Sequence, residues 1–163
     1  MSEQASDHSN VVVFPPVVPI VTIALGFALQ WLFPLSVLVH FDQFDRVVIG
    51  LSLFVIGALI SSSGSVTLAR SATNILPSRP TLKIVSNGIY GWTRNPIYVG
   101  GSFAMVGIAV AFALDWLVLL QVPAHLILHY GIIRREERYL EQKFGEEYRS
   151  YKTRVPRYLL ING

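Results

Sequence analysis

The sequence predicts an all-α membrane protein: a polytopic bundle of about four transmembrane helices with a helical C-terminal extension on the cytoplasmic side. Only 14% of the residues are charged and 52% are hydrophobic, whereas soluble domains carry about 25% charged residues. Several apolar runs approach the roughly 20 residues that cross a bilayer. Of the 13 Lys and Arg residues, four lie within 70–94 and eight within 134–157. Such clustering beside apolar runs is typical of membrane proteins.

The composition excludes several classes of chemistry. The chain contains no cysteine, so it has no disulfide, thiolate metal ligand, thiol nucleophile or lipidated cysteine. The net charge of +3 does not indicate a nucleic-acid partner, because the basic residues flank apolar runs. Residues 1–10 contain Glu3 and Asp7 but no Lys or Arg. A secretory signal peptide is therefore not expected, and this segment is expected to be disordered.

Residues 11–163 are expected to form a single membrane domain. Its first span covers about 11–33 and should begin irregularly, because it carries three prolines near its start. The second span covers 46–63, and its helix should continue to about residue 72. Within it, Gly50 and Gly57 lie seven residues apart, on one face. Small residues on one face let membrane helices approach closely.

The third and fourth spans are expected at 96–113 and 116–133. Asn95-Pro96 suits a helix start, since Asn is a good N-cap and Pro fits the first helical position. The turn between the two spans is so short that they must form an antiparallel hairpin. A stripe of small residues on the third span should pack against another helix; it comprises Gly100, Ala104, Gly107 and Ala111.

The tail, residues 134–163, should continue the fourth helix out of the membrane until Gly145 ends or bends it. The basic residues of this tail and of the loop between spans two and three place both segments in the cytoplasm. Both termini then lie inside. The polar loop and the tail share one side of this multi-pass protein, where they can build a site together.

A glycine-punctuated loop that enters a helix, residues 86–101, is the first candidate site. A helix N-terminus presents free N–H groups and a partial positive charge, which can hold a carboxylate or a phosphate. Tyr90 and Trp92 could stack on a flat ring. The alternative is an aromatic belt where the span meets the membrane interface.

Glu136 and Glu137 form the second candidate site, where the fourth span leaves the membrane. Neighbouring side chains point about 100° apart on a helix, so one can face a pocket while the other faces solvent or an arginine. A carboxylate there could accept hydrogen bonds from ribose hydroxyls or offset the charge of a cationic cofactor. The alternative is a solvated helix with local Glu–Arg pairs.

His125 and His129 lie four apart on the fourth span. No third ligand accompanies them, so we expect no metal site. Ionisable residues inside a span usually face a cavity or a partner. His129 is seven residues before Glu136, on the same helical face, and is a candidate wall of the same pocket.

Two motifs carry a resemblance to a known family. The stretch from Ile84 to Gly100 (IVSNGIYGWTRNPIYVG) resembles the loop-to-helix motif of the isoprenylcysteine carboxyl methyltransferases and related phospholipid methyltransferases. The segments REERYL from Arg135, FGEEYRSYK from Phe144 and VPR from Val155 resemble the C-terminal half of the same motif set. The resemblance covers about residues 74–157.

The resemblance implies methyl transfer from S-adenosylmethionine to a lipophilic small molecule or a lipidated substrate. It implies a cofactor pocket between the last two spans and the C-terminal helix. The cofactor-binding residues that it implies are Leu82, Lys83, Ile84, Val85, Tyr90, Arg94, Asn95, Pro96, Ile97, Tyr98, Glu136 and Glu137.

The chain departs from the family's prenylcysteine enzymes at two positions. Asn95 stands where they have histidine, and Ile132 stands where they have a substrate-facing arginine, a role that Arg134 or Arg135 would take here. His129 would be the base if the acceptor were an amine. His129, Arg134 and Arg135 are therefore the predicted catalytic residues. Three alternatives remain open: a phospholipid or amine N-methyltransferase, an NADPH-dependent membrane reductase of the sterol reductase type, and a non-enzymatic membrane partner that keeps the motif as a scaffold.

Overall fold

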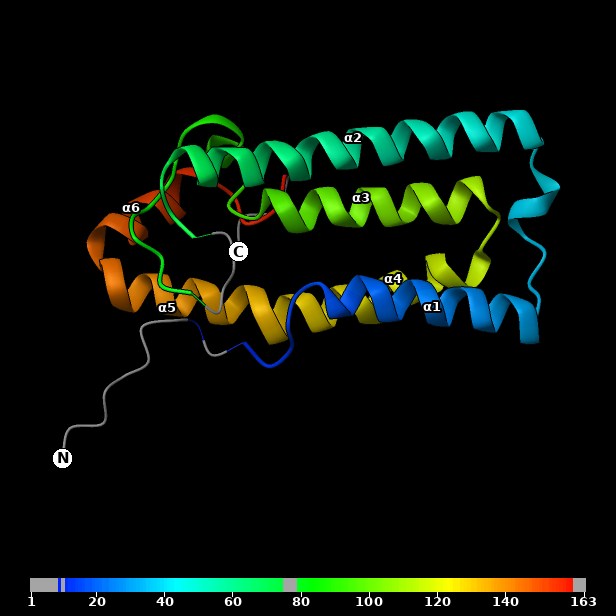
Figure 1. Cartoon of the computed structure of the whole chain (residues 1–163), viewed down its shortest axis with the longest axis horizontal. Helices are drawn as coiled ribbons and strands as arrows, with labels where there is room; N and C mark the ends of the chain where they lie inside the picture. The colour runs from blue at the N-terminus through cyan, green and yellow to red at the C-terminus, as the bar shows by residue number, and fades with distance from the viewer. Residues whose placement is uncertain (1–8, 10, 75–78, 160–163) are drawn as a thin grey trace.

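The computed structural model describes residues 9, 11–74 and 79–159, and it is all-helical over these residues (Figure 1). The segment for which disorder was expected, residues 1–10, lies outside this description except for Ser9. The elements run in chain order as α1 (Val17–Leu32), η1 (Leu38–His40), α2 (Gln43–Arg70), η2 (Gly88–Gly91), α3 (Pro96–Ala111), α4 (Asp115–Leu128), η3 (His129–Ile133), α5 (Arg134–Phe144) and α6 (Glu146–Arg154).

Proline decides where the first helix begins. The first span was expected from residue 11, with irregular first turns. The helix starts only at Val17, directly after Pro15-Pro16. Pro19 lies in the first turn of α1, where its missing N–H would have no partner within the helix. The expected irregularity therefore covers residues 11–16, which form bends and a turn before the helix.

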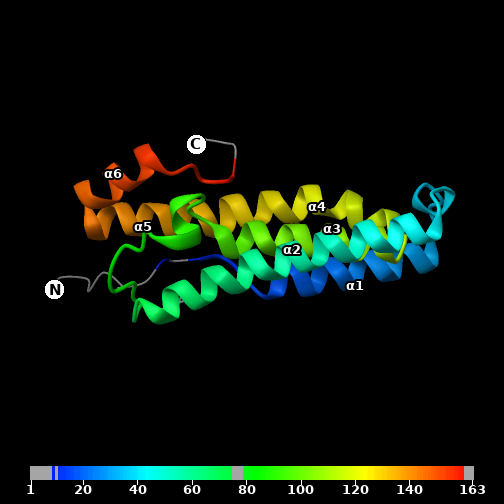
Figure 2. The ribbon, with the colours of Figure 1, turned by 90° about the horizontal axis from the view of Figure 1, so that it is seen from above.

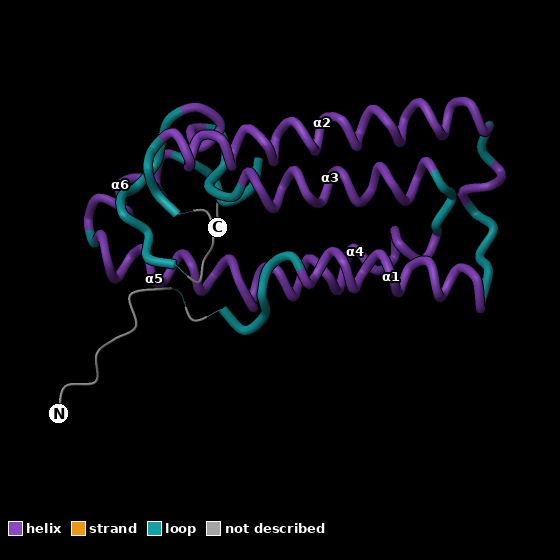
Figure 3. The backbone as a smooth tube through the Cα atoms, viewed as in Figure 1, coloured by secondary structure: helices purple, strands orange, loops and turns teal. Residues whose placement is uncertain are grey.

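The four long helices form two antiparallel pairs (Figure 1). α2 packs most extensively on α3, and α1 packs on α4. α3 and α4 are joined by a turn of three residues, which confirms the predicted hairpin. The connections between helices lie at the two ends of the bundle (Figure 3). One end carries η1 and the α3–α4 turn; the other, here called the polar end, carries the 71–95 loop, α5 and α6.

Glycines bring the backbones of α2 and α3 together, as the small-residue stripe predicted. A Cβ added to Gly50 would lie 2.5 Å from the backbone nitrogen of Ala111 and 2.7 Å from the carbonyl oxygen of Gly107. A Cβ on Gly100 would meet the carbonyl oxygen of Gly57 and would lie 2.5 Å from the backbone nitrogen of Ser61. Any side chain at these positions would force the two helices apart.

At the end opposite the polar end, Asp115 fixes the connection between α1 and α2. Its carboxylate is buried and accepts hydrogen bonds from the backbone N–H groups of Val37 (3.3 Å) and Leu38 (2.9 Å). These donors lie at the start of η1, so the first residue of α4 holds the loop that joins the two helix pairs.

The fourth helix continues into the tail, as expected. α4 passes through the π-helical turn η3 into α5, and Gly145, at φ +54°, ends α5. Few residues other than glycine adopt this φ easily. α6 then folds back beside α5 at the polar end (Figure 2).

The helix lengths support two of the four expected membrane spans. α2 and the continuous helix Asp115–Phe144 are long and apolar enough to cross a membrane. Only 17% and 22% of their most apolar stretches are buried, unlike the core helices of a soluble protein. α1 and α3 are also apolar but have 16 residues each. Each is about 24 Å long, against a hydrocarbon core of about 30 Å.

The bounds of the later helices also differ from those of the predicted spans. The second helix extends beyond the predicted span, which ended at Ser63, to Arg70. This agrees with the helical continuation that was expected to about residue 72. The third ends at Ala111 instead of residue 113, because Ala113 adopts φ +51° in the tight turn. The fourth starts at Asp115 instead of residue 116 and continues past residue 133, as expected.

Candidate functional site

A cavity of about 410 Å³ lies between the two helix pairs and extends to the polar end. Every residue predicted to bind a cofactor, except Leu82, lines it. Leu82 is 62% exposed and lies outside the cavity wall. The other predicted residues come together from the 79–95 loop, the first turn of α3 and the first turn of α5.

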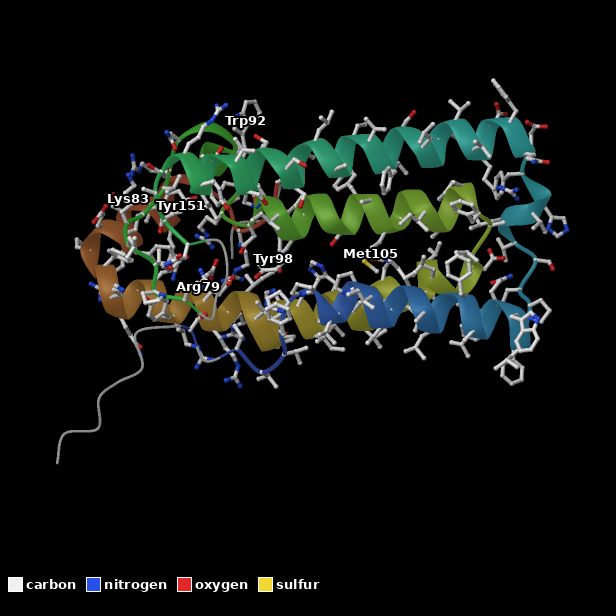
Figure 4. All side chains as sticks on the ribbon, in the orientation of Figure 1. Arg79, Lys83, Trp92, Tyr98, Met105 and Tyr151 are labelled. Carbon is white, nitrogen blue, oxygen red and sulfur yellow. The ribbon has the colours of Figure 1, made fainter. Side chains whose placement is uncertain are left out.

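Tyr98 and Glu136 meet across the cavity. Tyr98 projects from the first turn of α3 toward the other helix pair (Figure 4). Its hydroxyl donates a hydrogen bond of 3.1 Å to Oε1 of Glu136, which lies in the first turn of α5. This bond holds the carboxylate in the cavity wall. It also leaves Oε2, and the second lone pair of Oε1, to accept from a ligand.

The neighbouring carboxylate, Glu137, forms a buried ion cluster. Nη2 of Arg94 lies 3.0 Å from its Oε1, and Nη2 of Arg157 lies 2.6 Å from its Oε2. Nε of Arg157 also donates to both carboxylate oxygens, at 3.1 and 3.0 Å. Both glutamates therefore line the cavity, and they differ in their partners: Glu136 binds a tyrosine, and Glu137 binds two arginines, as one member of the pair was expected to do. The alternative of a solvated helix with local pairs is wrong for Glu137.

The C-terminal segment is bound to the loop before α3. The backbone N–H of Arg94 donates to the carbonyl oxygen of Pro156 (2.9 Å), and Nη1 of Arg94 donates to that of Lys152 (3.1 Å). The carbonyl oxygen of Arg157 accepts from Thr93 Oγ1 (2.8 Å) and from Asn95 Nδ2 (3.2 Å). Asn95 thus occupies the N-cap position of α3, but its side chain binds the C-terminal segment instead of capping the helix.

Two buried tyrosines form another part of this end of the cavity. The hydroxyl of Tyr151, on α6, donates a hydrogen bond of 2.7 Å to the carbonyl oxygen of Tyr90. Burial raises the pKa of Tyr90 and of Tyr151 above the usual value for a phenol. Both side chains are therefore neutral at physiological pH and act as apolar rings with one hydroxyl each.

The 79–85 loop forms the rim of the cavity at the polar end. The hydroxyl of Tyr139, on α5, accepts from the backbone N–H of Thr81 at 3.2 Å, and Thr73 Oγ1 accepts from the backbone N–H of Leu82 at 3.0 Å. Lys83, labelled in Figure 4, lies in the wall next to them. The cavity is thus bordered by a cation from this loop and by the carboxylate of Glu136.

Away from the polar end, the cavity becomes an apolar arm. It is lined by side chains of three helices, among them Val18 of α1, Met105 of α3 and Leu128 of α4. Gln121 and His125 add polar atoms from α4. One continuous space therefore has a polar part and an apolar part.

The predicted catalytic residues lie outside the cavity wall. Nδ1 of His129 lies 2.7 Å from the hydroxyl of Tyr158 and forms a hydrogen bond with it. Its neighbour His125, one turn earlier, lines the cavity instead. The guanidinium of Arg134 sits 5.6 Å from the ring centroid of Tyr130, and Arg135 is half-buried on α5 beyond the wall. The catalytic roles of these three residues stay predictions.

Sequence reasoning missed several residues of the site. Arg157, Tyr148 and Tyr151 were part of a motif but were given no place in the site. The spacing of Tyr148 and Tyr151, three apart on a short polar helix, puts both on one face, and this face is buried. That pair was the available signal. No sequence signal pointed to the pairing of Arg157 with Glu137, because no local spacing relates two residues twenty positions apart.

Comparison with known proteins gives a family. The family described as Phospholipid methyltransferase matches residues 45–147, more than half of the chain. Protein-S-isoprenylcysteine O-methyltransferase B of Arabidopsis thaliana is 31% identical over 117 residues, which cover 66% of this chain and 55% of the relative. The mouse protein-S-isoprenylcysteine O-methyltransferase is 30% identical over 111 residues, which cover 66% of this chain and 38% of the relative.

A shorter bacterial relative shares the same region. An uncharacterized protein of Haemophilus influenzae is 35% identical over 71 residues, which cover 44% of this chain and 87% of that protein. By contrast, the matched region spans about half or less of the length of the isoprenylcysteine methyltransferases. Family membership and the apolar helices together indicate membrane association.

Proposed function

The chain belongs to the phospholipid methyltransferase family, and from this premise we propose that it transfers a methyl group from S-adenosylmethionine to a lipophilic acceptor. One observation carries the proposal: the continuous cavity that joins a polar part at Tyr98 and Glu136 to an apolar arm. A polar cofactor and an apolar acceptor need such a space to meet. The names of the isoprenylcysteine methyltransferases support the same class of reaction.

The residues of the polar part fit the cofactor. The cavity volume of about 410 Å³ lies in the range of roughly 300–1,000 Å³ that is typical of small-ligand pockets. Glu136 offers carboxylate oxygens that can accept from ribose hydroxyls or face a positive charge. Tyr90 offers a buried ring against which a flat base can pack. Lys83 offers a cation for a carboxylate.

When bound, S-adenosylmethionine supplies a methyl group on a positively charged sulfur, which is already activated for transfer. The protein must then align donor and acceptor and keep them in place, and alignment alone can contribute about 7–11 kcal/mol. Tyr98 fixes the Glu136 carboxylate, and the cluster around Glu137 fixes the helix that carries it. A ligand bound to Glu136 is therefore held in a rigid frame.

The acceptor would occupy the apolar arm. Its wall is formed by side chains such as Met105 and Leu128, which suits a hydrocarbon chain. Whether the methylated atom belongs to a carboxylate, a thiol or an amine stays open. The clustered basic residues of the polar end support a multi-pass protein with this end in the cytoplasm. The cofactor would then enter from the cytoplasm.

Ligand binding to the purified protein in lipid nanodiscs tests the cofactor site. S-adenosylhomocysteine, measured by calorimetry, should bind the wild type. Glu136→Gln should weaken binding by roughly tenfold or more, because a hydrogen bond to a charged group contributes about 1.5–3 kcal/mol. Tyr98→Phe should weaken it less, since it only loosens the carboxylate. In sealed vesicles, the ligand should bind only from the face that carries the polar end.

Matched variants outside the cavity serve as controls. Glu147→Gln removes an exposed carboxylate of α6, and Tyr130→Phe removes the hydroxyl of an exposed tyrosine near α5. Both should bind as the wild type does. Binding of NADPH in place of S-adenosylhomocysteine would favour a reductase. If Glu136→Gln and Glu147→Gln bound equally well, the assigned site would be wrong. Incubation with labelled S-adenosylmethionine and lipid extracts would identify the acceptor.

A further inference from the structure

Two adjacent glycines of α3, Gly100 and Gly101, face different surroundings. A Cβ on Gly100 would meet the backbone of α2, as described above. A Cβ on Gly101 would find no heavy atom of the described residues within 4 Å. Close helix packing therefore explains the first glycine but not the second. A glycine inside a helix costs about 1 kcal/mol relative to alanine, so its presence at an open position calls for another explanation.

The open space beside Gly101 belongs to the cavity, because Gly101 is one of its lining residues. The cavity face of α3 runs from Tyr98 through Gly101 and Ser102 to Met105. Tyr98 binds Glu136 in the polar part, whereas Met105 is buried in the apolar arm. Figure 4 shows both labelled side chains extending from α3 toward the α1–α4 pair. Gly101 thus lies between the two parts of the cavity.

We propose that Gly101 is a specificity-determining residue, which keeps the passage between the polar part and the apolar arm wide enough for the acceptor's chain. The proposal rests on the proposed function, in which the acceptor lies in the arm and reaches the cofactor through this passage. A helix rises about 1.5 Å per residue, so Met105 lies about 10 Å beyond Tyr98 along α3. A side chain at Gly101 would enter the passage partway along that distance.

Gly131 provides a matched control. Within the described part of the chain, a Cβ on Gly131 would also find no heavy atom within 4 Å, but Gly131 is not among the residues that line the cavity. Leucine at either glycine adds the same four carbon atoms to a helical position, in α3 for Gly101 and in η3 for Gly131. Only leucine at Gly101 would place them in the passage. A difference between the two variants therefore reports on the passage and not on the tolerance of a helix for leucine.

The absence of cysteine from the chain allows a test that needs no substrate. Met105→Cys introduces a single thiol in the apolar arm. A charged, water-soluble methanethiosulfonate reagent, added to the protein in nanodiscs, can reach this thiol only through the polar part. Mass spectrometry then gives the labelling rate. Adding Gly101→Leu should slow labelling at least tenfold, whereas adding Gly131→Leu should leave the rate within twofold.

A second measurement follows the reaction itself. Gly101→Leu should bind S-adenosylhomocysteine within threefold of the wild type but should lose transfer to the acceptor. Gly101→Ala should keep transfer to slender straight-chain acceptors and reduce it for branched ones. If Gly101→Leu slowed labelling no more than Gly131→Leu, or if the parent thiol were not labelled at all, the proposed passage would be wrong. A wild type without methyl transfer would overturn the proposed function, and the labelling rates would still decide on the passage.

Discussion

The same residue types have different roles where helices pack tightly and where side chains border the open cavity. Gly100 is small because the backbone of α2 occupies the space beside it, and Gly101 borders a space that stays open. Both glutamates line the cavity, but the carboxylate of Glu137 is bound by two arginines, whereas that of Glu136 has one neutral partner, Tyr98. In each pair, one residue holds the structure together and its neighbour is available to a ligand. Helical geometry separates the two roles, because adjacent side chains point about 100° apart.

Placing a side chain on the packed face should give the largest effect. Gly100→Leu would drive the side chain into the backbone of α2 at Gly57 and Ser61. Overpacking usually costs about 1–3 kcal/mol, and here the obstacle is backbone, which cannot move aside. We expect a loss of at least about 3 kcal/mol, with little folded protein recovered. Size-exclusion chromatography and circular dichroism in detergent would measure it.

Gly101→Leu is the matched variant on the cavity face. It should fold and melt as the wild type does, because no atom lies within 4 Å of the added Cβ. If both leucine variants folded equally well, the contrast between the two faces of α3 would be wrong. If both failed to fold, the space beside Gly101 would not be open in the membrane.

Removing the charge of Glu137 should give the next largest effect. Glu137→Gln leaves the buried guanidinium of Arg94 without its carboxylate. Breaking a buried ion pair from one side costs about 3–5 kcal/mol. Chemical denaturation in detergent micelles should show that loss. Glu136→Gln should cost much less stability and act on ligand binding instead. If the two variants were destabilised equally, the distinction between a structural role for Glu137 and a ligand-binding role for Glu136 would be wrong.

An exposed ion pair should give the smallest effect, and this effect should depend on pH. The hydrogen bond from Lys152 and the charge of this lysine, with a further hydrogen bond from Arg149, lower the pKa of Glu141 below its usual 4.5. A lowered pKa in the folded state contributes stability above the unfolded value, and the contribution is lost as pH falls through the folded value. Glu141 joins α5 to α6, so the pair supports the polar end only while the carboxylate is ionised.

Denaturation of the wild type and of Glu141→Gln from pH 7 to pH 3 tests this point. The wild type should be slightly more stable at pH 7, and the difference should shrink as the pH falls through the lowered pKa of Glu141. High salt should reduce the difference, since exposed charges are screened. A difference that grew as the pH fell would contradict the assigned pairing.

Local patterns predicted much of the fold. The spacing of the glycines predicted the α2–α3 contact, because small residues seven apart in a helix share one face. The short turn predicted the α3–α4 hairpin for purely geometric reasons. The family motifs predicted much of the polar part of the cavity wall, and the adjacent glutamates predicted a carboxylate there.

Long-range pairings and the register of the fourth helix could not be predicted from local sequence patterns. Arg94, Glu137 and Arg157 come from three segments, and only the folded chain shows that they meet. The spacing of seven between His129 and Glu136 placed both on one face of a regular α-helix. The π-helical turn η3 lies between them. A π turn contains one more residue than an α turn, which rotates His129 relative to Glu136. The structure accordingly puts His125 in the wall instead.

The ion cluster also constrains the order in which the protein can mature. A chain grows from its N-terminus, so Arg94 leaves the ribosome well before Glu137 and last of all Arg157. Until Glu137 emerges, Arg94 in the loop before α3 lacks its carboxylate partner. Until Arg157 emerges, Thr93 and Asn95 lack the carbonyl oxygen to which they donate. The apolar helices can pair during synthesis, whereas the polar end of the cavity closes only when the segment with Arg157 arrives. An incomplete nascent chain would therefore have its bundle before it has a formed ligand site.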